Sequence, residues 1–417
     1  MKAHWKKIVL MALLVSVSSL KAMVYDNRFW PLYPQPFFSN QNVVWDYAGR
    51  AVFWGSDDAF GSSLGDDLHE DDETPLFQLY GRYDQVKIDA ALRKAGIITT
   101  SLLRSDMRRV DKIPWNTFGK INVKGAVFES FLHLGSYFGI GGSYVFGKVN
   151  SHLQLERNRR ESSLSSSLSP GDEQELVLLN QKIDELLHLT APSYSRFSSG
   201  DLDLYARFHV VRDYCHKFRR IDAGVNLGFL IPTASEIPLN NPAALSLGGP
   251  KHFGMYGAFD GTFILKEDLT FGLLLRLSQR FSKVACHRMP IADEPINYGA
   301  VVGLARVTPG LTIIFSPRIQ LDGLRDGLGV NVAYQLVYHK EDEWEPFIKA
   351  NYRAIERRSS WGSDYMSVSA FYDFGYDKDC AKNAPILSMT VDVPFEGLVT
   401  KRVSKTFGVS LRIESRL

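Results

Sequence analysis

The feature that most constrains this chain is an alternation of apolar with polar or glycine residues that returns in segment after segment. Each segment has about ten residues, the length of a strand that crosses a membrane in a β-barrel. The clearest segment sets Ile221, Ala223, Val225, Leu227, Phe229 and Ile231 against Arg220, Asp222, Gly224, Asn226 and Gly228. Because successive side chains of a strand point to opposite faces, such a segment has one apolar and one polar face.

The pattern occurs near 41–55, 119–132, 136–149, 200–214, 218–231, 252–265, 268–281, 297–307, 311–321, 327–339, 344–355, 364–376, 384–393 and 404–416. We therefore predict an all-β fold, a transmembrane antiparallel up-and-down β-barrel of about 14 strands, and counts of 12 to 16 also fit such a barrel. Pro317 and Pro346 are weak points of this assignment, because proline has no N–H to donate to a ladder.

A soluble β-sandwich or lipocalin-like barrel also alternates, but its apolar face points inward. Three features favour the membrane barrel: the number of strands, the small residues on the polar face, and aromatic residues near strand ends. The aromatic residues are Phe253, Tyr338, Trp344 and Tyr352.

The connections between the segments fall into two classes. Those at 56–118, 150–199, 232–251 and 282–296 are long, and those at 133–135, 215–217, 266–267, 308–310 and 340–343 are tight. Long and short connections alternate along the first two thirds of the chain, which predicts long outer loops, short periplasmic turns and periplasmic termini. Residues 56–118 and 150–199 are expected to be long loops or lumen insertions with short helices, one near Tyr83–Lys94 and one opening at Gly171.

The N-terminus has the layout of a secretory signal. Lysines at positions 2, 6 and 7 precede an apolar stretch from Ile8 to Leu20, which is followed by Lys21 and Ala22. The stretch is short for an uncleaved membrane anchor. We predict a signal peptide over residues 1–22, cleavage after Ala22, a single barrel domain over 23–417, and export to the outer membrane of a Gram-negative bacterium.

Charge, cysteines and motifs exclude several classes of function. Without residues 1–22 the chain carries 44 basic and 46 acidic residues, so its formal net charge is −2 and no nucleic-acid partner is indicated. Cys215, Cys286 and Cys380 lie far apart, which indicates neither a zinc site nor a disulfide framework. No catalytic motif appears in a suitable context, so we expect no cofactor and no enzyme, with an outer-membrane enzyme kept as an alternative.

The polar strand faces supply the candidate lumen-lining residues. They are Asp203, Arg207, His209, Arg220, Asp222, Asp260, Arg276, Arg280, Asn331, Lys349, Arg353 and Asp373. Facing rows of opposite charge are how water-filled barrels keep a polar interior. The favoured function is a passive channel or porin for small solutes, and the alternatives are a structural or adhesion barrel with a closed lumen and a hydrophobic-compound transporter.

An acidic segment over residues 57–73 invites a calcium assignment. It contains Asp57, Asp58, Asp66, Asp67, Glu70, Asp71, Asp72 and Glu73, with His69 among them. The spacing is not that of an EF-hand, so the pattern favours a solvated acidic loop.

The C-terminal stretch Thr406-Phe407-Gly408-Val409-Ser410-Leu411-Arg412-Ile413 resembles the targeting signal of outer-membrane barrels. The resemblance implies recognition by the barrel-assembly machinery, although the chain ends in Arg416-Leu417 and not in an aromatic residue. Outer-membrane lipids and small solutes are the other expected partners, and a monomer and a trimer both fit.

A second stretch, Asn240-Asn241-Pro242-Ala243-Ala244, is similar to an asparagine-proline-alanine stretch of the hydrophobic-substrate channels typified by the long-chain fatty-acid transporter. In that family the stretch lies near the mature N-terminus, whereas here it lies mid-chain in an expected outer loop. The resemblance implies a hydrophobic substrate. The other interpretation is an Asn-Pro turn flanked by small residues.

Overall fold

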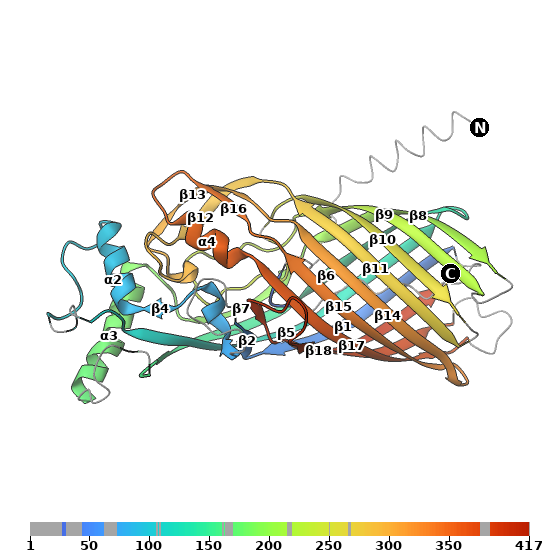
Figure 1. Cartoon of the computed structure of the whole chain (residues 1–417), viewed down its shortest axis with the longest axis horizontal. Helices are drawn as coiled ribbons and strands as arrows, with labels where there is room; N and C mark the ends of the chain where they lie inside the picture. The colour runs from blue at the N-terminus through green and yellow to red at the C-terminus, as the bar shows by residue number, and fades with distance from the viewer. Residues whose placement is uncertain are drawn as a thin grey trace.

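The structure, a computed structural model, describes residues 27–30, 44–61, 73–105, 107, 110–160, 162, 170–214, 219–249, 251–265, 268–375 and 384–416. Its main element is a closed antiparallel barrel, in which each strand pairs with the next and the last pairs with the first (Figure 1). The barrel strands are β1 (Trp45–Ser56), β5 (Pro114–His133), β6 (Phe138–Arg157), β8 (Leu202–Asp213), β9 (Arg220–Ile231), β10 (Gly254–Ile264), β11 (Leu269–Arg280), β14 (Thr312–Arg325), β15 (Leu328–His339), β17 (Trp361–Asp373), β18 (Ile386–Phe395) and β20 (Phe407–Arg416).

The ring closes between the first and last barrel strands. Asp46 of β1 lies opposite Arg416 of β20, and the ladder runs without interruption to Gly55 opposite Phe407. Closure leaves the sheet without an exposed edge, so every strand finds a partner on both sides. The predicted fold class is confirmed, whereas the predicted count of about 14 is too high, because twelve strands close the ring.

Two of the predicted strands, 297–307 and 344–355, are not part of the barrel. They belong to long connections that fold together beside it, as a small sheet of β12 (Lys283–Met289), β13 (Val301–Thr308) and β16 (Glu343–Pro346), with the 3-10 helix η3 (Ile296–Tyr298) and the helix α4 (Tyr352–Ser359). This sheet alternates because it buries one face in a small core of its own, around Met289, Val307 and Ile355. Alternation of apolar and polar residues indicates a strand with one buried face, but it does not indicate which sheet the strand joins.

With those two strands removed, successive connections alternate between the two rims of the barrel. The short-connection rim carries 134–137, 214–219, 265–268, 326–327 and 374–385, and the long-connection rim carries 57–113, 158–201, 232–253, 281–311, 340–360 and 396–406. Only the last pair does not differ in length, because 374–385 is about as long as 396–406. The predicted turns at 308–310 and 340–343 therefore lie within long connections. Trp45, where the barrel begins, and Arg416, where it ends, lie at the rim of the short connections.

The apolar face of the strands points outward. In β18, Ser388, Thr390 and Asp392 are buried inside the barrel, whereas Leu387 and Met389 are 43% and 49% exposed. The same division holds in β20, where Ser410 and Arg412 are buried and Leu411 and Ile413 are exposed. A soluble barrel would place its apolar face inside, so that alternative is excluded and the surface is that of a barrel in lipid.

Aromatic side chains mark both rims of this apolar surface. At the long-connection rim Phe229, Phe253 and Phe281 form a row, with neighbouring ring centroids 6.0 and 5.8 Å apart. At the short-connection rim Trp45 and Tyr47 are both exposed. Aromatic girdles at the two interfaces are typical of transmembrane barrels.

Strands β5 and β6 continue beyond the barrel and carry most of the remaining elements (Figure 1). These are β7 (Ser193–Ser199), which pairs with β6, β4 (Tyr83–Asp84), which pairs with β5, the helices α2 (Gln85–Lys94) and α3 (Pro170–Leu186), the 3-10 helix η1 (Leu76–Tyr80), and a small sheet of β2 (Asp58–Phe60), β3 (Glu73–Pro75) and β19 (Val403–Ser404). Both predicted helices are confirmed. No helix in the described part of the chain is long and apolar enough to cross a membrane.

The outward orientation of β15 yields a first prediction. Val332 is 39% exposed on the outer face. Val332→Arg should lower the free energy of unfolding by about 2 to 4 kcal/mol, because the arginine charge enters lipid. The control Asn122→Arg changes an exposed polar position of β5 beyond the apolar belt and should stay within about 0.5 kcal/mol of the wild type. Equilibrium unfolding in phosphatidylcholine vesicles measures both, and equal effects of the two variants would contradict a lipid-facing Val332.

Candidate functional site

The barrel encloses a cavity of about 170 Å³ whose wall combines charged and apolar side chains. Six of the predicted lumen residues lie in this wall: Asp203, Arg207, Asp222, Asp260, Arg276 and Asn331. Apolar and aromatic residues complete it, among them Phe131, Tyr205, Tyr256, Ala258 and Leu274. Leu274, the one apolar residue out of phase in its predicted strand, therefore faces inward.

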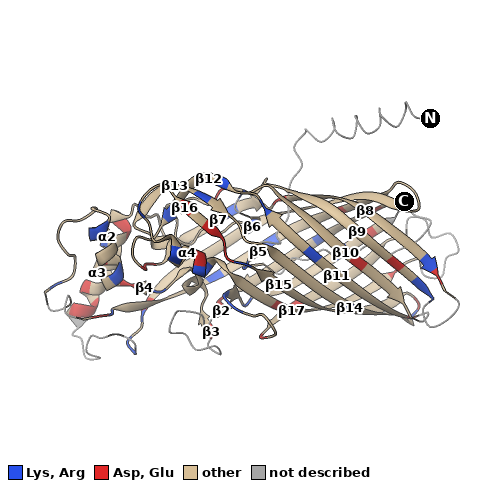
Figure 2. Cartoon of the chain, turned by 45° about the horizontal axis from the view of Figure 1, so that its top comes forward, with Lys and Arg blue, Asp and Glu red and all other residues tan. Residues whose placement is uncertain are grey.

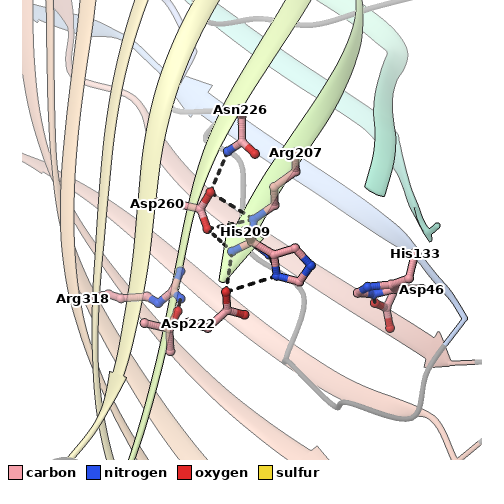
Figure 3. Close-up of polar contacts among 9 residues, drawn as sticks. Asp46, His133, Arg207, His209, Asp222, Asn226, Asp260 and Arg318 are labelled. Carbon is pink, nitrogen blue, oxygen red and sulfur yellow. Dashed lines mark hydrogen bonds and ion pairs between the residues drawn. The ribbon is translucent and has the colours of Figure 1, made fainter. Parts of the chain in front are cut away.

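Arg207 of β8 is the centre of a network across three neighbouring strands (Figure 3). Its guanidinium lies 3.0 Å from Asp222 Oδ1 of β9, and its Nε donates to Asp260 Oδ1 of β10 at 3.2 Å. Asn226 Nδ2 also donates to Asp260, at 2.7 Å, and His209 Nδ1 lies 3.3 Å from Asp222.

Glycine makes room for this arrangement. A Cβ at Gly224 of β9 would lie 2.8 Å from the Nε of Arg207, so glycine at that position lets the long side chain cross its neighbouring strand in the observed conformation. Gly272 of β11 acts in the same way, because a Cβ there would overlap the guanidinium of Arg318.

Charged positions are scattered along the barrel strands, between stretches of other residues (Figure 2). Two further ion pairs join inward charges. Arg276 Nη1 lies 2.8 Å from Asp203, and its guanidinium stacks 3.5 Å from the ring centroid of Tyr256. Arg280 lies 2.7 Å from Asp201, and the side chains of both residues are almost fully buried.

A third group of inward charges was not among the predicted residues. Arg412 of β20 contacts both Glu129 and Glu414, at 3.1 and 3.0 Å, and Arg50 of β1 lies 3.4 Å from Glu129. His133 and Asp46, 2.9 Å apart, complete the set near the short-connection rim (Figure 3). Arg412 and Glu414 occupy the polar phase of their strand, but Glu129 shares its phase with Val123, Val127 and Phe131, so alternation did not mark it as a polar lumen position.

The wall formed by β14 and β15 differs from the rest of the cavity. Arg318 has no carboxylate within 4.0 Å among the described residues, and its Nη2 donates to Thr262 Oγ1 at 2.8 Å while its Nε is buried without a partner. Asn331 Oδ1 and Gln335 Oε1, on the same wall, are also buried without a partner. Buried polar atoms are almost always hydrogen-bonded, so this wall has unused capacity for a water or a ligand.

The backbone ladder is interrupted at the same place. The β14–β15 pairing runs to Phe315 opposite Leu336 and resumes in the same register at Arg318 opposite Ala333. Ser316 and Pro317 lie in the gap, and Pro317 has no N–H to donate. The predicted strand at 311–321, which Pro317 made doubtful, is therefore a barrel strand, and its pairing with β15 has a local gap beside the cavity.

The remaining predicted residues lie elsewhere. Arg220 and Asp373 are the terminal residues of β9 and β17, at the short-connection rim. Lys349 and Arg353 are not lumen residues, and this corrects the prediction: both are exposed, Lys349 in the β15–β17 connection and Arg353 on α4. The helix begins there because Asn351 caps it by accepting a hydrogen bond from the backbone N–H of Ala354.

An apolar cluster lies at the end of the barrel nearest the long connections, where the Asp201–Arg280 pair is also buried. Inward residues of β1 and β6, such as Trp54 and Val149, join residues of the chain segments inserted between the strands, such as Trp30 and Leu247. Trp30 stacks on Trp54 with ring centroids 6.1 Å apart, and its Nε1 donates to the backbone oxygen of Ser246 at 3.0 Å. Segments from far apart in the sequence thus meet in one apolar cluster at the long-connection end of the barrel.

The 240–244 stretch and the 57–113 connection both enter this cluster. Ala243 and Ala244 are buried in it, and Asn241 Oδ1 accepts from the Ala243 N–H at 2.9 Å, which makes the stretch a turn. Leu76 and Phe77 of η1 are fully buried there too, so part of the 57–113 connection packs into this cluster. The predicted signal peptide with its cleavage after Ala22, and most of the acidic 57–73 segment, lie outside the described residues.

Among the described residues no group of histidine, cysteine, aspartate and glutamate side chains is arranged to hold a metal ion. Cys286 is exposed and free.

No family model and no curated protein sequence matches the chain. Among solved structures, it is similar to an outer-membrane channel from Pseudomonas putida F1, with 11% identity over 93% of this chain and 100% of that chain and a TM-score of 0.49. The transport unit of the autotransporter AIDA-I from Escherichia coli has 6% identity over 92% and 93% of the two chains and a TM-score of 0.37. The Pseudomonas putida toluene transporter TodX has 10% identity over 90% and 89% and a TM-score of 0.30.

These identities and TM-scores are too low to assign a family or a substrate. The resemblance of the sequence to outer-membrane β-barrels holds at the level of the class.

The buried ion pairs yield a second prediction. Arg276→Met should lower the free energy of unfolding by about 3 to 5 kcal/mol, because it leaves Asp203 buried without its cation. The matched control Arg306→Met breaks the exposed pair with Glu345 and should cost about 0 to 1 kcal/mol. The double variant Asp203→Leu with Arg276→Met should recover most of the loss. Urea titration in vesicles measures all three, and similar losses for Arg276→Met and its control would refute the assigned role of the pair.

Proposed function

We propose that this chain is a bacterial outer-membrane channel that carries small hydrophobic compounds. The observation that carries the proposal is the apolar cluster at the end of the barrel next to the long connections, around Trp30, Trp54 and Leu247. An apolar compound gains about 25 cal/mol for each Å² of its surface that such an environment removes from water. A water-filled channel is instead lined by polar and charged side chains.

The arrangement of the inward charges favours a narrow barrel interior over the open, water-filled interior of a porin. Arg207, Arg276 and Arg412 each contact carboxylates across the lumen side of the strands. Paired charges close space between strands, whereas the facing rows of a porin stay apart and hydrated. The hydrophobic-compound transporter, an alternative in the sequence interpretation, is therefore preferred to the small-solute porin, and both share the coarser description of a barrel channel.

The gap beside the cavity offers a route for an apolar compound. The gap at Ser316 and Pro317 lies between the cavity and the lipid-facing surface, where Phe315 and Ile319 are exposed. Opening the wall there costs less than elsewhere, because the proline has no hydrogen bond to lose. We infer that the compound passes from the apolar cluster to the cavity and leaves through this wall into the bilayer.

The proposal includes the orientation of the barrel in the outer membrane. We place the long connections outside the cell and the short ones in the periplasm, the arrangement usual for outer-membrane barrels. Export by a signal peptide and recognition of β20 by the assembly machinery remain predictions from the sequence.

The charged cavity favours a second candidate, a channel for small polar solutes, and one pair of measurements separates the two. Purified protein is placed in planar bilayers for conductance and in liposomes for uptake of a radiolabelled aromatic hydrocarbon. The hydrophobic channel predicts saturable uptake with little conductance. Discrete conductance steps without uptake would favour the polar channel, and neither signal from a folded barrel would favour the closed structural barrel.

A disulfide across the gap gives a third prediction. Ser316→Cys with Gln335→Cys, in a variant whose three native cysteines are serine, joins two positions directly opposite each other in the β14–β15 register. When oxidised, the bond should slow hydrocarbon uptake about tenfold or more if the gap must open, and reductant should restore the rate.

The matched control is Ser369→Cys with Thr390→Cys, which joins opposite, inward positions in the intact β17–β18 ladder. Its oxidation should leave uptake unchanged. If both locks slow uptake equally, or neither does, the route through the wall is wrong.

A further inference from the structure

The outer face of β5 and β6 changes character along its length. Within the barrel belt the outward residues are aromatic or aliphatic, as at Phe128, which is 52% exposed, and Ala126. One step further toward the long connections the outward residues of both strands become lysine, at Lys124 and Lys148. The next outward positions, Asn122 and Asn150, are polar, and this change marks where the lipid-facing surface ends on the long-connection side.

The two lysines lie directly opposite each other in the strand register. Like charges at such a position repel, because directly opposed side chains have Cβ atoms about 4.5 to 5.5 Å apart. Both side chains are exposed, and neither has a carboxylate within 4.0 Å among the described residues. Lys120, four residues before Lys124 on the same face of β5, forms one ion pair among the described residues, with the exposed Asp57 at 3.8 Å. The pair is therefore a concentration of positive charge that the described part of the chain leaves uncompensated.

Aromatic rings lie beside the lysines and on their short-connection side, with Phe197 directly opposite Lys148 in the β6–β7 register. Phe128 and Phe146 stack with centroids 5.6 Å apart, and Phe146 lies 5.8 Å from Phe197, which is 66% exposed. Phe53 of β1 lies opposite Lys124 in the register and is also exposed. Cationic groups thus sit at the edge of an apolar surface that is broad enough to hold acyl chains.

We propose that this face, made of Lys124, Lys148, Phe128, Phe146 and Phe197, binds a phosphorylated glycolipid of the outer leaflet. The phosphates lie against the two ammonium groups and the acyl chains along the aromatic rings. Charge complementarity selects an anion, and the depth of the lysines at the apolar boundary selects one that is fixed to a lipid. The inference rests on the proposed orientation, with the long connections outside the cell, but not on what the barrel transports.

Native mass spectrometry of the full chain in detergent micelles tests the site, with lipid A as the probe and dephosphorylated lipid A as the comparison. Wild-type protein should retain lipid A and bind the dephosphorylated form more weakly. Lys124→Ser with Lys148→Ser should weaken lipid A binding about tenfold or more. The control Lys340→Ser with Lys349→Ser removes the same charge from exposed positions of the β15–β17 connection and should leave binding unchanged.

Folding of the variants is checked by the unfolding temperature in micelles without lipid A. The Lys124/Lys148 double variant should be at least as stable as the wild type, because the substitution removes a repulsion. Equal binding by the double variant and the wild type, equal losses in the control, or equal binding of the two lipid forms would each overturn the proposal. Hydrocarbon uptake is measured separately, so a failure of the transport proposal does not alter these outcomes.

Discussion

The hydrogen-bond ladder that closes between β1 and β20 is the constraint on which the rest of the structure depends. Backbone N–H and C=O groups have no water to bond within a bilayer, so a sheet can cross it only if the last strand returns to the first. Closure at once defines an inside and an outside, and the two phases of every strand then meet different surroundings. In β20, Leu411 and Ile413 therefore point outward, whereas Arg412 and Glu414, in the other phase of the strand, point inward and pair with each other.

A closed ring of twelve strands has a small interior, and what fills it sets the chemistry of the protein. Charged side chains there are satisfied only by contacting one another, as Arg207 does with Asp222 and Asp260. Further toward the long connections apolar residues take over, and the connections themselves fold back to complete the cluster. The charged and apolar parts meet at a cavity whose β14–β15 wall is the least complete, both in its backbone ladder and in the partners of Arg318 and Asn331.

Several elements of this arrangement could be predicted from residues alone because they depend on local periodicity. Alternation located the barrel strands, the helical pattern that opens at Gly171 located α3, and the polar phase identified Arg207, Asp222 and Arg276 as inward residues. The same reasoning failed at 297–307 and 344–355, since a small sheet on its own core alternates as a barrel strand does. Lys349 and Arg353 were assigned to the lumen only through that error. Arg412 and Glu129 were missed as a site, because a single strand does not show which charge will face which.

By itself the sequence determined that the chain forms antiparallel strands with one apolar and one polar face, since side-chain direction in a strand depends only on the position along it. Which face meets lipid, how many strands close the ring and which carboxylate pairs with which arginine were decided only by the tertiary structure. Those properties depend on register between strands that are distant in the chain, such as β1 with β20 and β8 with β10 through β9. The gap beside Pro317 shows both levels together: the proline is visible in the sequence, but its place between a cavity and the lipid-facing surface exists only once the barrel is closed.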